Sequence, residues 1–321
     1  MSGSTNNEPA FTRITRRSGK SSAIAAILIL SACVLHSAGC RHEGSVPETQ
    51  GLSIRDDLGR VVRLHGPAKR VVSLAPSITE IVCALGCDSA LAGVTNFCDF
   101  PPSVLRKPKV GDLVNPSLEA ILALRPDLVL ISVEGNSRET FSRLVEMKLP
   151  VFVSSPRTMD DVLSSMTDLG VLLGCPASAQ RLTDSLSRVR AALLRSSRPG
   201  APSVLMLIAT EPLIVAGRDT FLDEMIRHSG ARNAGDGGRG RYPALNREEV
   251  LRRNPDVLLY SSDLRVTRDA LLRLFPEWRR LSAFTRGRCE EVDANLYLRP
   301  GPRLFRGLTS LRDIVDSLNT R

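Results

Sequence analysis

The sequence predicts an α/β fold of two similar lobes, joined by one long helix, with a ligand cleft between the lobes. A repeat is the first observation: residues 119–132 read EAILALRPDLVLIS and residues 248–261 read EEVLRRNPDVLLYS, at an offset of 129 positions. Short apolar runs of strand length also alternate with helical patterns, which is typical of a parallel sheet covered by helices. The length of 321 residues suits two domains of ordinary size.

The N-terminal segment is predicted to be an export signal. Basic residues up to Lys20 precede an apolar run at 23–30, which is too short to span a bilayer but has the length of a signal-peptide core. The motif LSAC at 30–33 resembles the bacterial lipobox, so we expect Cys33 to be the acylated first residue of the mature protein. SAGC, which ends at Cys40, is the second candidate, and an uncleaved membrane anchor is the alternative. In each case the body is extracytoplasmic (periplasmic or at the cell surface) and tethered to a membrane.

Five segments follow from these observations. We expect a lipoprotein signal peptide at 1–32, a tether at 33–52, an N-terminal α/β lobe at 53–175, a bridging helix at 176–197 and a C-terminal α/β lobe at 198–321.

Composition and charge narrow the class of partner. Apolar residues at 42% and charged residues at 24% are those of a soluble globular protein. Without residues 1–32 the formal net charge falls from +9 to +6, and this remainder is spread along the chain without a basic block or interleaved aromatic residues. Nucleic acid is therefore not expected as a partner.

The cysteines of the body show no disulfide framework, although export would permit disulfides. There are five of them: Cys83, Cys87, Cys98, Cys175 and Cys289. Cys83 and Cys87 have the spacing of metal ligands on a helix, but Gly86 is expected to end that helix between them and no histidine is near. We expect small buried residues and predict no metal site.

The elements of the N-terminal lobe follow from apolar patterning and cap residues. Ser77 is the expected N-cap of the first helix, with Glu80 in capping-box position and Gly86 at its end. Asn115 is the expected cap of the second helix. The expected elements are an entry strand or hairpin at 59–64, strands at 70–76, 91–95, 126–132 and 149–155, and helices at 77–86, 115–124 and 159–173.

The pattern restarts after a long, charged, amphipathic helix at about 177–195. Even the first helices of the two lobes correspond, since Glu80 lies six residues before Gly86 and Glu224 six before Gly230. The expected elements are strands at 203–208 and 256–261 and helices at 221–230, 246–254 and about 302–318.

The cleft is predicted to bind a ligand, because clefts between lobes are a usual place for one. The motifs G-x-S-x-G and H-E-x-x-H and a P-loop lysine are absent from the sequence, so no catalytic residue is predicted. The glycine-rich stretch at 235–240 is expected to form a mobile loop at the cleft mouth. Arginine offers a forked donor to anionic groups, and tyrosine an apolar face with a hydroxyl. The candidates for ligand contact are Arg239, Arg241, Arg299, Arg303, Tyr242 and Tyr297.

Four motifs together resemble the cobalamin and ferric-siderophore binding proteins of bacterial ABC importers. They are DDLGRVVRL, KRVVSLAPSITEIVCALG, NPSLEAILALRPDLVL and LYLRPGPR, and the resemblance runs from residue 54 to residue 318. It implies two Rossmann-like lobes, a rigid connecting helix with little hinge motion, and a ligand held between the lobes. It also implies a monomer that delivers its ligand to an ABC importer permease dimer.

The resemblance assigns a use to the repeat. In this family a glutamate at the tip of each lobe meets arginines of the permease, and by position in the motif these glutamates match Glu119 and Glu248.

Within the family, the stretches VTNFCDFPP and RYPALNREEV are most similar to the cobalamin-binding branch. The resemblance then implies pocket contacts from Phe97, Leu113, Tyr242, Asn295 and Arg299. Cobalamin binders often line the pocket with tryptophan, whereas the single tryptophan here, Trp278, lies in a region that does not match. A corrinoid is the expected ligand, and a ferric siderophore or haem stays an alternative. For haem, Tyr242 or Tyr297 would be the axial ligand.

An enzyme on a similar two-lobed scaffold, such as a chelatase that inserts metal into a tetrapyrrole, is the alternative from another class. The export signal argues against it, because that chemistry is usually cytoplasmic. So does the lack of a histidine and carboxylate cluster suited to deliver metal. We therefore predict a binding protein without catalytic residues, metal or cofactor of its own.

Overall fold

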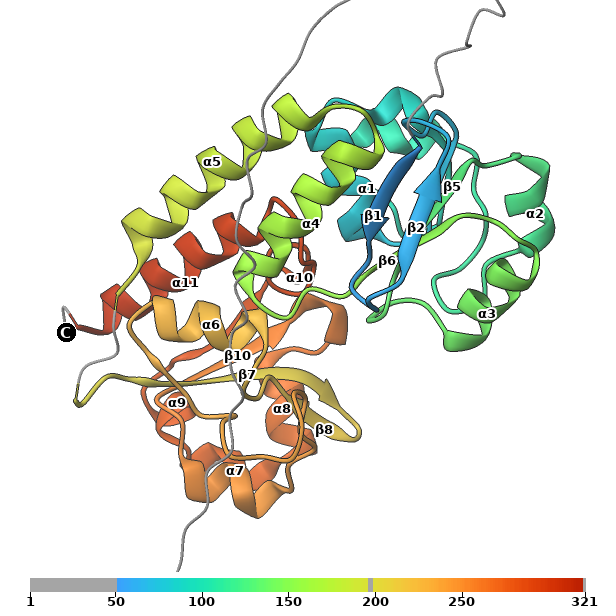
Figure 1. Cartoon of the computed structure of the whole chain (residues 1–321). Coiled ribbons are helices and arrows are strands. Elements are labelled where there is room, and N and C mark those ends of the chain that lie inside the picture. The colour runs from blue at the N-terminus through green and yellow to red at the C-terminus, as the bar shows by residue number, and fades with distance from the viewer. Residues whose placement is uncertain (1–50, 196–198, 320–321) are drawn as a thin grey trace, which may run out of the picture. The chain divides into compact units, whose positions relative to one another are not determined.

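The computed structural model describes residues 51–195 and 199–319, and the part of the chain from Glu48 onward forms one compact unit. This unit contains two α/β lobes (Figure 1). The predicted signal peptide and both candidate acylation sites, Cys33 and Cys40, lie outside the described residues. In the described ranges, no helix has both the length and the apolar character needed to cross a membrane.

The N-terminal lobe contains a hairpin and a four-stranded parallel sheet. The hairpin pairs β1 (Leu52–Arg55) with β2 (Val61–Leu64), so the tether expected through residue 52 ends one residue earlier. The sheet has the order β4 (Leu91–Val94), β3 (Val71–Ser73), β5 (Leu128–Ser132), β6 (Val151–Ser154). Its helices are α1 (Pro76–Ala84), α2 (Leu118–Ala123), α3 (Arg138–Glu146) and α4 (Met159–Leu172).

The C-terminal lobe repeats this plan with a five-stranded, mostly parallel sheet. Its path is β11 (Cys289–Val292), β10 (Val257–Ser261), β7 (Ser203–Thr210), β8 (Leu213–Val215), and β9 (Arg232–Asn233) pairs with β7. The β7–β8 pair is antiparallel. The helices are α6 (Phe221–His228), α7 (Arg247–Arg253), α8 (Arg268–Leu274), α9 (Ser282–Thr285), α10 (Ala294–Tyr297) and α11 (Leu304–Asn319). The predicted α/β class with two lobes is therefore confirmed.

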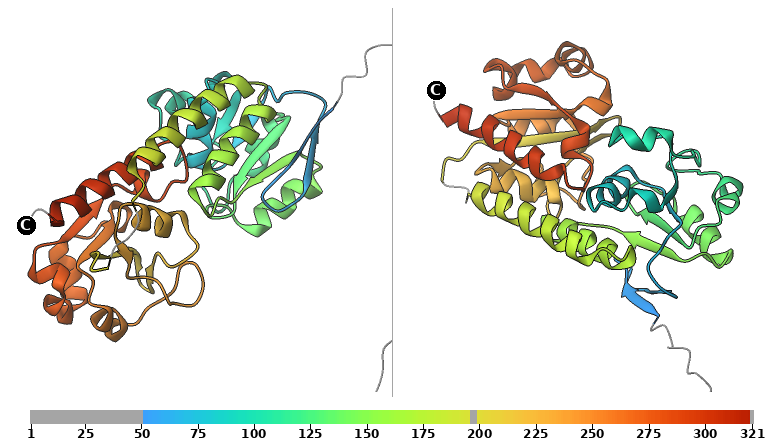
Figure 2. Two further views of the ribbon diagram at one scale, coloured as in Figure 1. Left: turned by 60° about the vertical axis from the view of Figure 1, so that its left-hand side comes forward. Right: turned by 90° about the horizontal axis from the view of Figure 1, so that it is seen from above.

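One long helix, α5 (Pro176–Leu193), connects the lobes and runs beside α11, as the views of Figures 1 and 2 both show. Behind the junction the lobes share one apolar cluster, which includes Ile78 of α1, Met166 of α4 and Leu308 of α11. Each sheet also has a separate cluster on its other face. The two lobes are therefore packed together along one side by a continuous core.

The sequence repeat is a structural repeat at the same offset of 129 positions. Its strands, β5 and β10, occupy equivalent registers, and Arg125 and Asn254 ahead of them both have left-handed backbone, with φ of 46° and 40°. Asp127 accepts hydrogen bonds from the backbone N–H groups of Lys69 and Arg70, just before β3. Asp256 accepts one from the N–H of Ser203, the first residue of β7. The repeated Pro-Asp thus satisfies a backbone donor at the start of the neighbouring strand in each lobe.

Two predicted helix starts are wrong. Helix α1 begins at Pro76, which has no N–H to satisfy, and Ala75 occupies the cap position without a side-chain hydrogen bond, so Ser77 is not the cap. Glu80 forms no capping box, since it binds arginines of the other lobe. Helix α2 is capped by Ser117, whose hydroxyl accepts from Ala120 N, rather than by Asn115.

We expect Gly170→Ala to destabilise the protein where α4 packs on the first turn of α5. A Cβ atom on Gly170 would lie 2.3 Å from the Cβ of Ala179, so one of the two helices must shift. Overpacking of this kind costs about 1–3 kcal/mol, more than the helix propensity gained by the change. Chemical denaturation measures the effect. Gly66→Ala is the control, since a Cβ there meets no atom within 4 Å, and an equal effect of both changes would contradict the packing explanation.

Candidate ligand-binding pocket between the lobes

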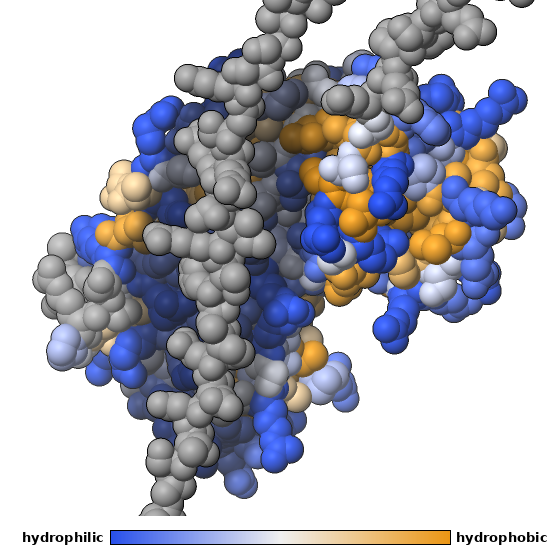
Figure 3. Space-filling model, viewed as in Figure 1, coloured by the Kyte–Doolittle hydropathy of each residue, from blue (hydrophilic) through white to orange (hydrophobic). Residues whose placement is uncertain are grey.

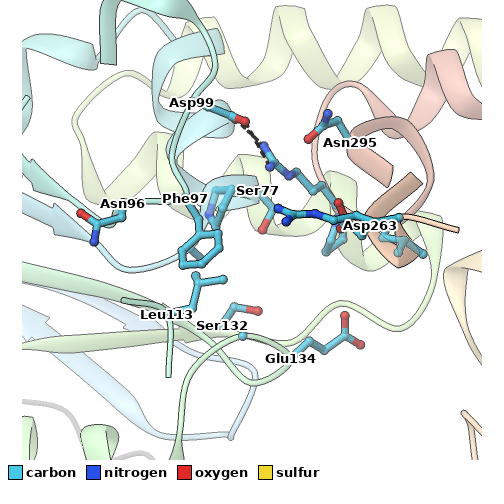
Figure 4. A pocket seen from close by; sticks show the side chains of 16 residues that line it. Ser77, Asn96, Phe97, Asp99, Leu113, Ser132, Glu134, Asp263 and Asn295 are labelled. Carbon is cyan, nitrogen blue, oxygen red and sulfur yellow. Dashed lines mark hydrogen bonds and ion pairs between the residues drawn. The ribbon is translucent and has the colours of Figure 1, made fainter. Parts of the chain in front are cut away.

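A pocket of about 750 Å³ lies between the two lobes (Figure 4). Its lining comes from loops that follow the strands of both sheets: residues after β3, β4 and β5 in the N-terminal lobe, and residues after β10 together with α10 and its following turn in the C-terminal lobe. The carboxyl ends of parallel strands are where α/β proteins place their ligands. The volume is within the range usual for small-molecule sites.

The wall from the N-terminal lobe is partly apolar. Phe97, 49% exposed, and Leu113 line it, with Ala75 and Pro76 at the start of α1. In Figure 3 the visible apolar surface gathers on this lobe, whereas the visible face of the C-terminal lobe is mainly hydrophilic. Large apolar side chains exposed in the described residues lie mostly before residue 150. In the pocket itself, Phe97 and Leu113 can contact the apolar face of a large ligand.

The opposite wall is polar and charged. It carries Asp263 and Arg265, which follow β10, and Asn295 and Arg299 from α10 and the turn after it. The Asn295 amide group donates to Asp293 Oδ1 at 2.8 Å, so its amide oxygen is oriented away from that carboxylate. Figure 4 shows Phe97 and Leu113 on one side of the pocket and Asp263 and Asn295 on the other.

Arg299 is held between two carboxylates of the N-terminal lobe. Its Nη1 donates to Asp99 Oδ1 at 2.7 Å and to Glu80 Oε1 at 3.2 Å. Burial alone would raise the pKa of Asp99, but the hydrogen bonds and charge of Arg299 outweigh burial and lower that pKa. Arg299 therefore presents a guanidinium to the pocket whose charge is already balanced.

Glu134 lies at the rim near the C-terminal lobe. Desolvation raises its pKa, while the charge of Arg241 and a hydrogen bond from the Tyr242 hydroxyl oppose that rise. Burial, and secondarily the charge of Glu134, raise the pKa of Tyr242, which keeps that hydroxyl protonated as a donor.

Four of the nine predicted contact residues line this pocket, and five, among them Arg239 and Arg241, lie outside its lining. Phe97, Leu113, Asn295 and Arg299 line it. Tyr242 binds the rim residue Glu134 instead, Tyr297 is buried at 2% exposure in the core, and Arg303 binds Glu80 behind the wall. Tyr297 lies outside the lining because its position on α10 faces the shared core, a direction that residue type does not reveal.

Glu134 and Asp263, which line opposite walls, are not among the residues predicted from the sequence. Both lie two residues beyond the strands of the repeat and are 129 positions apart. Extending the repeat past Ser132 and Ser261 would have found them.

The glycine-rich loop at 235–240 does not line this pocket. Asp236 in it accepts two hydrogen bonds from Arg218, both at 2.9 Å, and Arg239 is exposed away from the lining. The loop was expected at the cleft mouth on glycine content alone, which does not specify where a loop lies.

Glu119 and Glu248 occupy equivalent places, in the first turns of α2 and α7, and both are exposed. A hydrogen bond from its own backbone N–H, followed by one from the Ser117 hydroxyl, lowers the pKa of Glu119. Glu119 is therefore ionised at neutral pH. Each lobe thus presents a carboxylate to solvent.

Two α/β lobes with an open pocket at the carboxyl ends of their strands define a two-lobed ligand-binding protein. A family model described as "Periplasmic binding protein" matches residues 71–296, and the chain belongs to that family. Members of this family are substrate-binding proteins of ABC importers, and the chain is one of them.

Three similar proteins each cover more than half of the chain. An uncharacterised ABC transporter substrate-binding lipoprotein, YvrC of Bacillus subtilis, is 28% identical over 312 residues, 92% of this chain and 97% of that protein. A vitamin B12-binding protein of Pectobacterium carotovorum is 30% identical over 194 residues, 60% of this chain and 70% of that protein. The solved apo structure of the haem-binding protein RhuT from Roseiflexus sp. RS-1 has a TM-score of 0.69 at 30% identity and covers 77% of this chain and 98% of that one.

A vitamin B12-binding protein of Vibrio cholerae, at 23% identity, shares the fold with a TM-score of 0.68, covering 79% of this chain and 99% of that one.

Proposed function

We propose that this protein is an extracytoplasmic, lipid-anchored binding protein that captures a corrinoid and delivers it to an ABC importer permease. A ferric siderophore or haem is the alternative ligand. The choice of a corrinoid rests on the side chains that line the pocket. They form an apolar wall, several amide and hydroxyl groups, and a nearly balanced set of charges. The likeness to vitamin B12-binding proteins supports it.

The pocket lining is poorly suited to bind haem iron. Among the pocket-lining residues in the described part of the chain there is no tyrosine, histidine, methionine or cysteine. Haem iron in proteins is held by one of these side chains. The Tyr242 hydroxyl donates a hydrogen bond to Glu134, and Tyr297 is buried in the core. A corrinoid brings its cobalt with ligands already bound and makes no such demand.

Charge argues against a strongly anionic iron chelate. The lining carries three carboxylates, Asp99, Glu134 and Asp263, against two guanidiniums, Arg265 and Arg299. Complementary charge favours binding, and like charge disfavours it. A corrinoid with uncharged peripheral amides can instead exchange hydrogen bonds with Asn96, Asn295 and the serine hydroxyls of the lining. These groups form the hydrogen-bonding surface on which the proposal rests.

Titration of the purified protein with cyanocobalamin, ferric hydroxamate and catecholate siderophores, and haem tests the proposal. We expect saturable binding of cyanocobalamin, one per chain, with micromolar or tighter affinity, and release of the ligand unchanged. Binding of a siderophore or haem without any binding of cyanocobalamin would reject the corrinoid. Catalytic turnover of a tetrapyrrole would reject the binding function itself.

The lipid anchor is a separate prediction. Acylation at Cys33 places the mature protein on a membrane, and mass spectrometry of the membrane fraction is expected to find lipid on that residue. Cys33→Ala is expected to release the protein to the soluble fraction, whereas Cys40→Ala is the matched control and should leave it anchored. Lipid on Cys40, or a soluble wild-type protein, would contradict the choice of site.

A further inference from the structure

Two glutamates in equivalent helices connect the lobes in opposite directions. Glu80 on α1 and Glu224 on α6 each lie six residues before a glycine with left-handed backbone, Gly86 at φ 75° and Gly230 at φ 89°. Glu80 extends from the N-terminal lobe to the C-terminal lobe, and Glu224 extends from the C-terminal lobe to the N-terminal lobe. We call these two contacts the glutamate ties.

The first tie is a buried ion pair behind the pocket wall. The Glu80 side chain is 2% exposed and accepts hydrogen bonds from Arg303 Nε at 2.8 Å and Nη2 at 2.5 Å, besides the one from Arg299. The Arg303 guanidinium lies 4.2 Å from the centroid of the Phe100 ring. Between the two arginines, Gly301 packs on α1, since a Cβ there would meet the carbonyl oxygen of Ser77 at 3.3 Å.

The second tie caps a helix of the other lobe. Glu224 Oε2 accepts a hydrogen bond from the backbone N–H of Met159 at 2.7 Å, at the first residue of α4. The first N–H groups of a helix have no partner within it, and a carboxylate there also meets the positive end of the helix dipole. Glu224 is mostly buried as well, with a side chain 14% exposed.

We propose that Glu80 and Glu224 are positioning residues that fix the separation of the two pocket walls, and that Glu80 also holds Arg299 in place to meet the ligand. Each tie joins an element of one lobe to an element of the other beside their shared apolar core, so we expect its loss to widen the range of wall separations without parting the lobes. A buried carboxylate with two arginine partners is also costly to leave unpaired. The part of this proposal that concerns ligand affinity rests on the proposed function, whereas the part that concerns wall separation does not.

The test measures wall separation without ligand. Fluorophores attached through non-natural side chains at exposed positions Glu139 on α3 and Arg273 on α8 report the distance between the lobes. Glu80→Gln and Glu224→Gln are each expected to broaden the distance distribution, and the double change to broaden it further. Glu249→Gln is the matched control, because Glu249 pairs with Arg253 within its own helix at 2.8 Å. Distributions equal to that of the wild type in both single variants would overturn the proposal.

Ligand affinity is measured in the same variants with cyanocobalamin as the probe. Glu80→Gln is expected to weaken binding by about tenfold or more, which is about 1.4 kcal/mol. Should Glu80→Gln fail to fold, Arg303→Lys keeps the charge but loses the forked contact, and it must show the same broadening. An unbroadened distribution in Arg303→Lys would then overturn the first tie. Absence of cyanocobalamin binding in the wild type would reject the corrinoid and leave the distance measurement to decide the ties.

Discussion

Replacing Glu119 and Glu248 together by alanine is expected to abolish transport while ligand affinity stays unchanged. Both side chains are exposed at the first turn of equivalent helices, and neither lines the pocket. If each carboxylate pairs with arginines of a two-fold permease, truncating one side of such a pair costs about 2–5 kcal/mol of complex stability. Either single change should therefore weaken the complex, and the double change should prevent it from forming. Reversal of both charges to arginine should be worse, through repulsion.

A purely structural role predicts a different result. An acidic residue in the first turn stabilises its helix by about 0.3–1 kcal/mol through the helix dipole and needs no partner. Removal would then lower thermal stability slightly and leave uptake intact. Glu139→Ala and Glu249→Ala are matched controls, because both are first-turn glutamates that pair with an arginine of their own helix. Normal uptake by the Glu119 and Glu248 double variant, measured in reconstituted vesicles, would leave both residues as helix-end acids.

The division into two similar lobes could be predicted because several features of the repeat are determined by local structure. Pro-Asp after a left-handed residue, an apolar run of five residues and a capped helix before them are each set by neighbours in sequence or by the adjacent strand. Asp127 and Asp256 are repeated because each satisfies backbone donors at the start of the neighbouring strand in its sheet. Such short-range requirements leave a clear pattern.

Short elements were missed. Helix α3 is capped by Ser137 and spaces Phe141, Leu144 and Val145 as a helix does, but these residues span little more than one turn, which is too short a run to distinguish a helix from a loop. Strand β9 has two residues and depends on β7 for its hydrogen bonds. Short segments of this kind form because a neighbour completes them, and sequence periodicity cannot report that.

The pocket lining was predicted only in part, because the sequence shows the type of a side chain but not the direction in which it points. The residue types that suit a ligand were identified, but Arg303 and Tyr297 have their partners behind the wall. Its position in the sequence predicts a local capping role for Glu80, whereas its partners in the fold are more than 200 residues away. Pairing between charged residues far apart in the sequence produces no periodic pattern. Only the three-dimensional structure shows such pairs.

Replacing the only tryptophan of the chain by alanine is expected to cause the largest loss of stability. Trp278 is fully buried and stacks on Phe275, with ring centroids 4.1 Å apart and planes inclined by 19°. Phe284 lies at 6.4 Å on another side, and the cluster fills one face of the C-terminal sheet. Deleting so large a side chain leaves a cavity that rigid strands do not close.

We therefore expect Trp278→Ala to lower the free energy of unfolding by about 3–5 kcal/mol, as measured by chemical denaturation followed by circular dichroism. Trp278→Phe is the informative partner change. The indole N–H is buried without a hydrogen-bond partner among the described residues, so phenylalanine removes an unsatisfied donor and keeps most of the ring contact. Its cost should be well below that of alanine. Trp278 does not line the pocket, so ligand affinity of the folded Trp278→Phe variant should equal that of the wild type. A large loss of affinity in that variant would mean that the ligand contacts this cluster, and would place the binding site away from the pocket between the lobes.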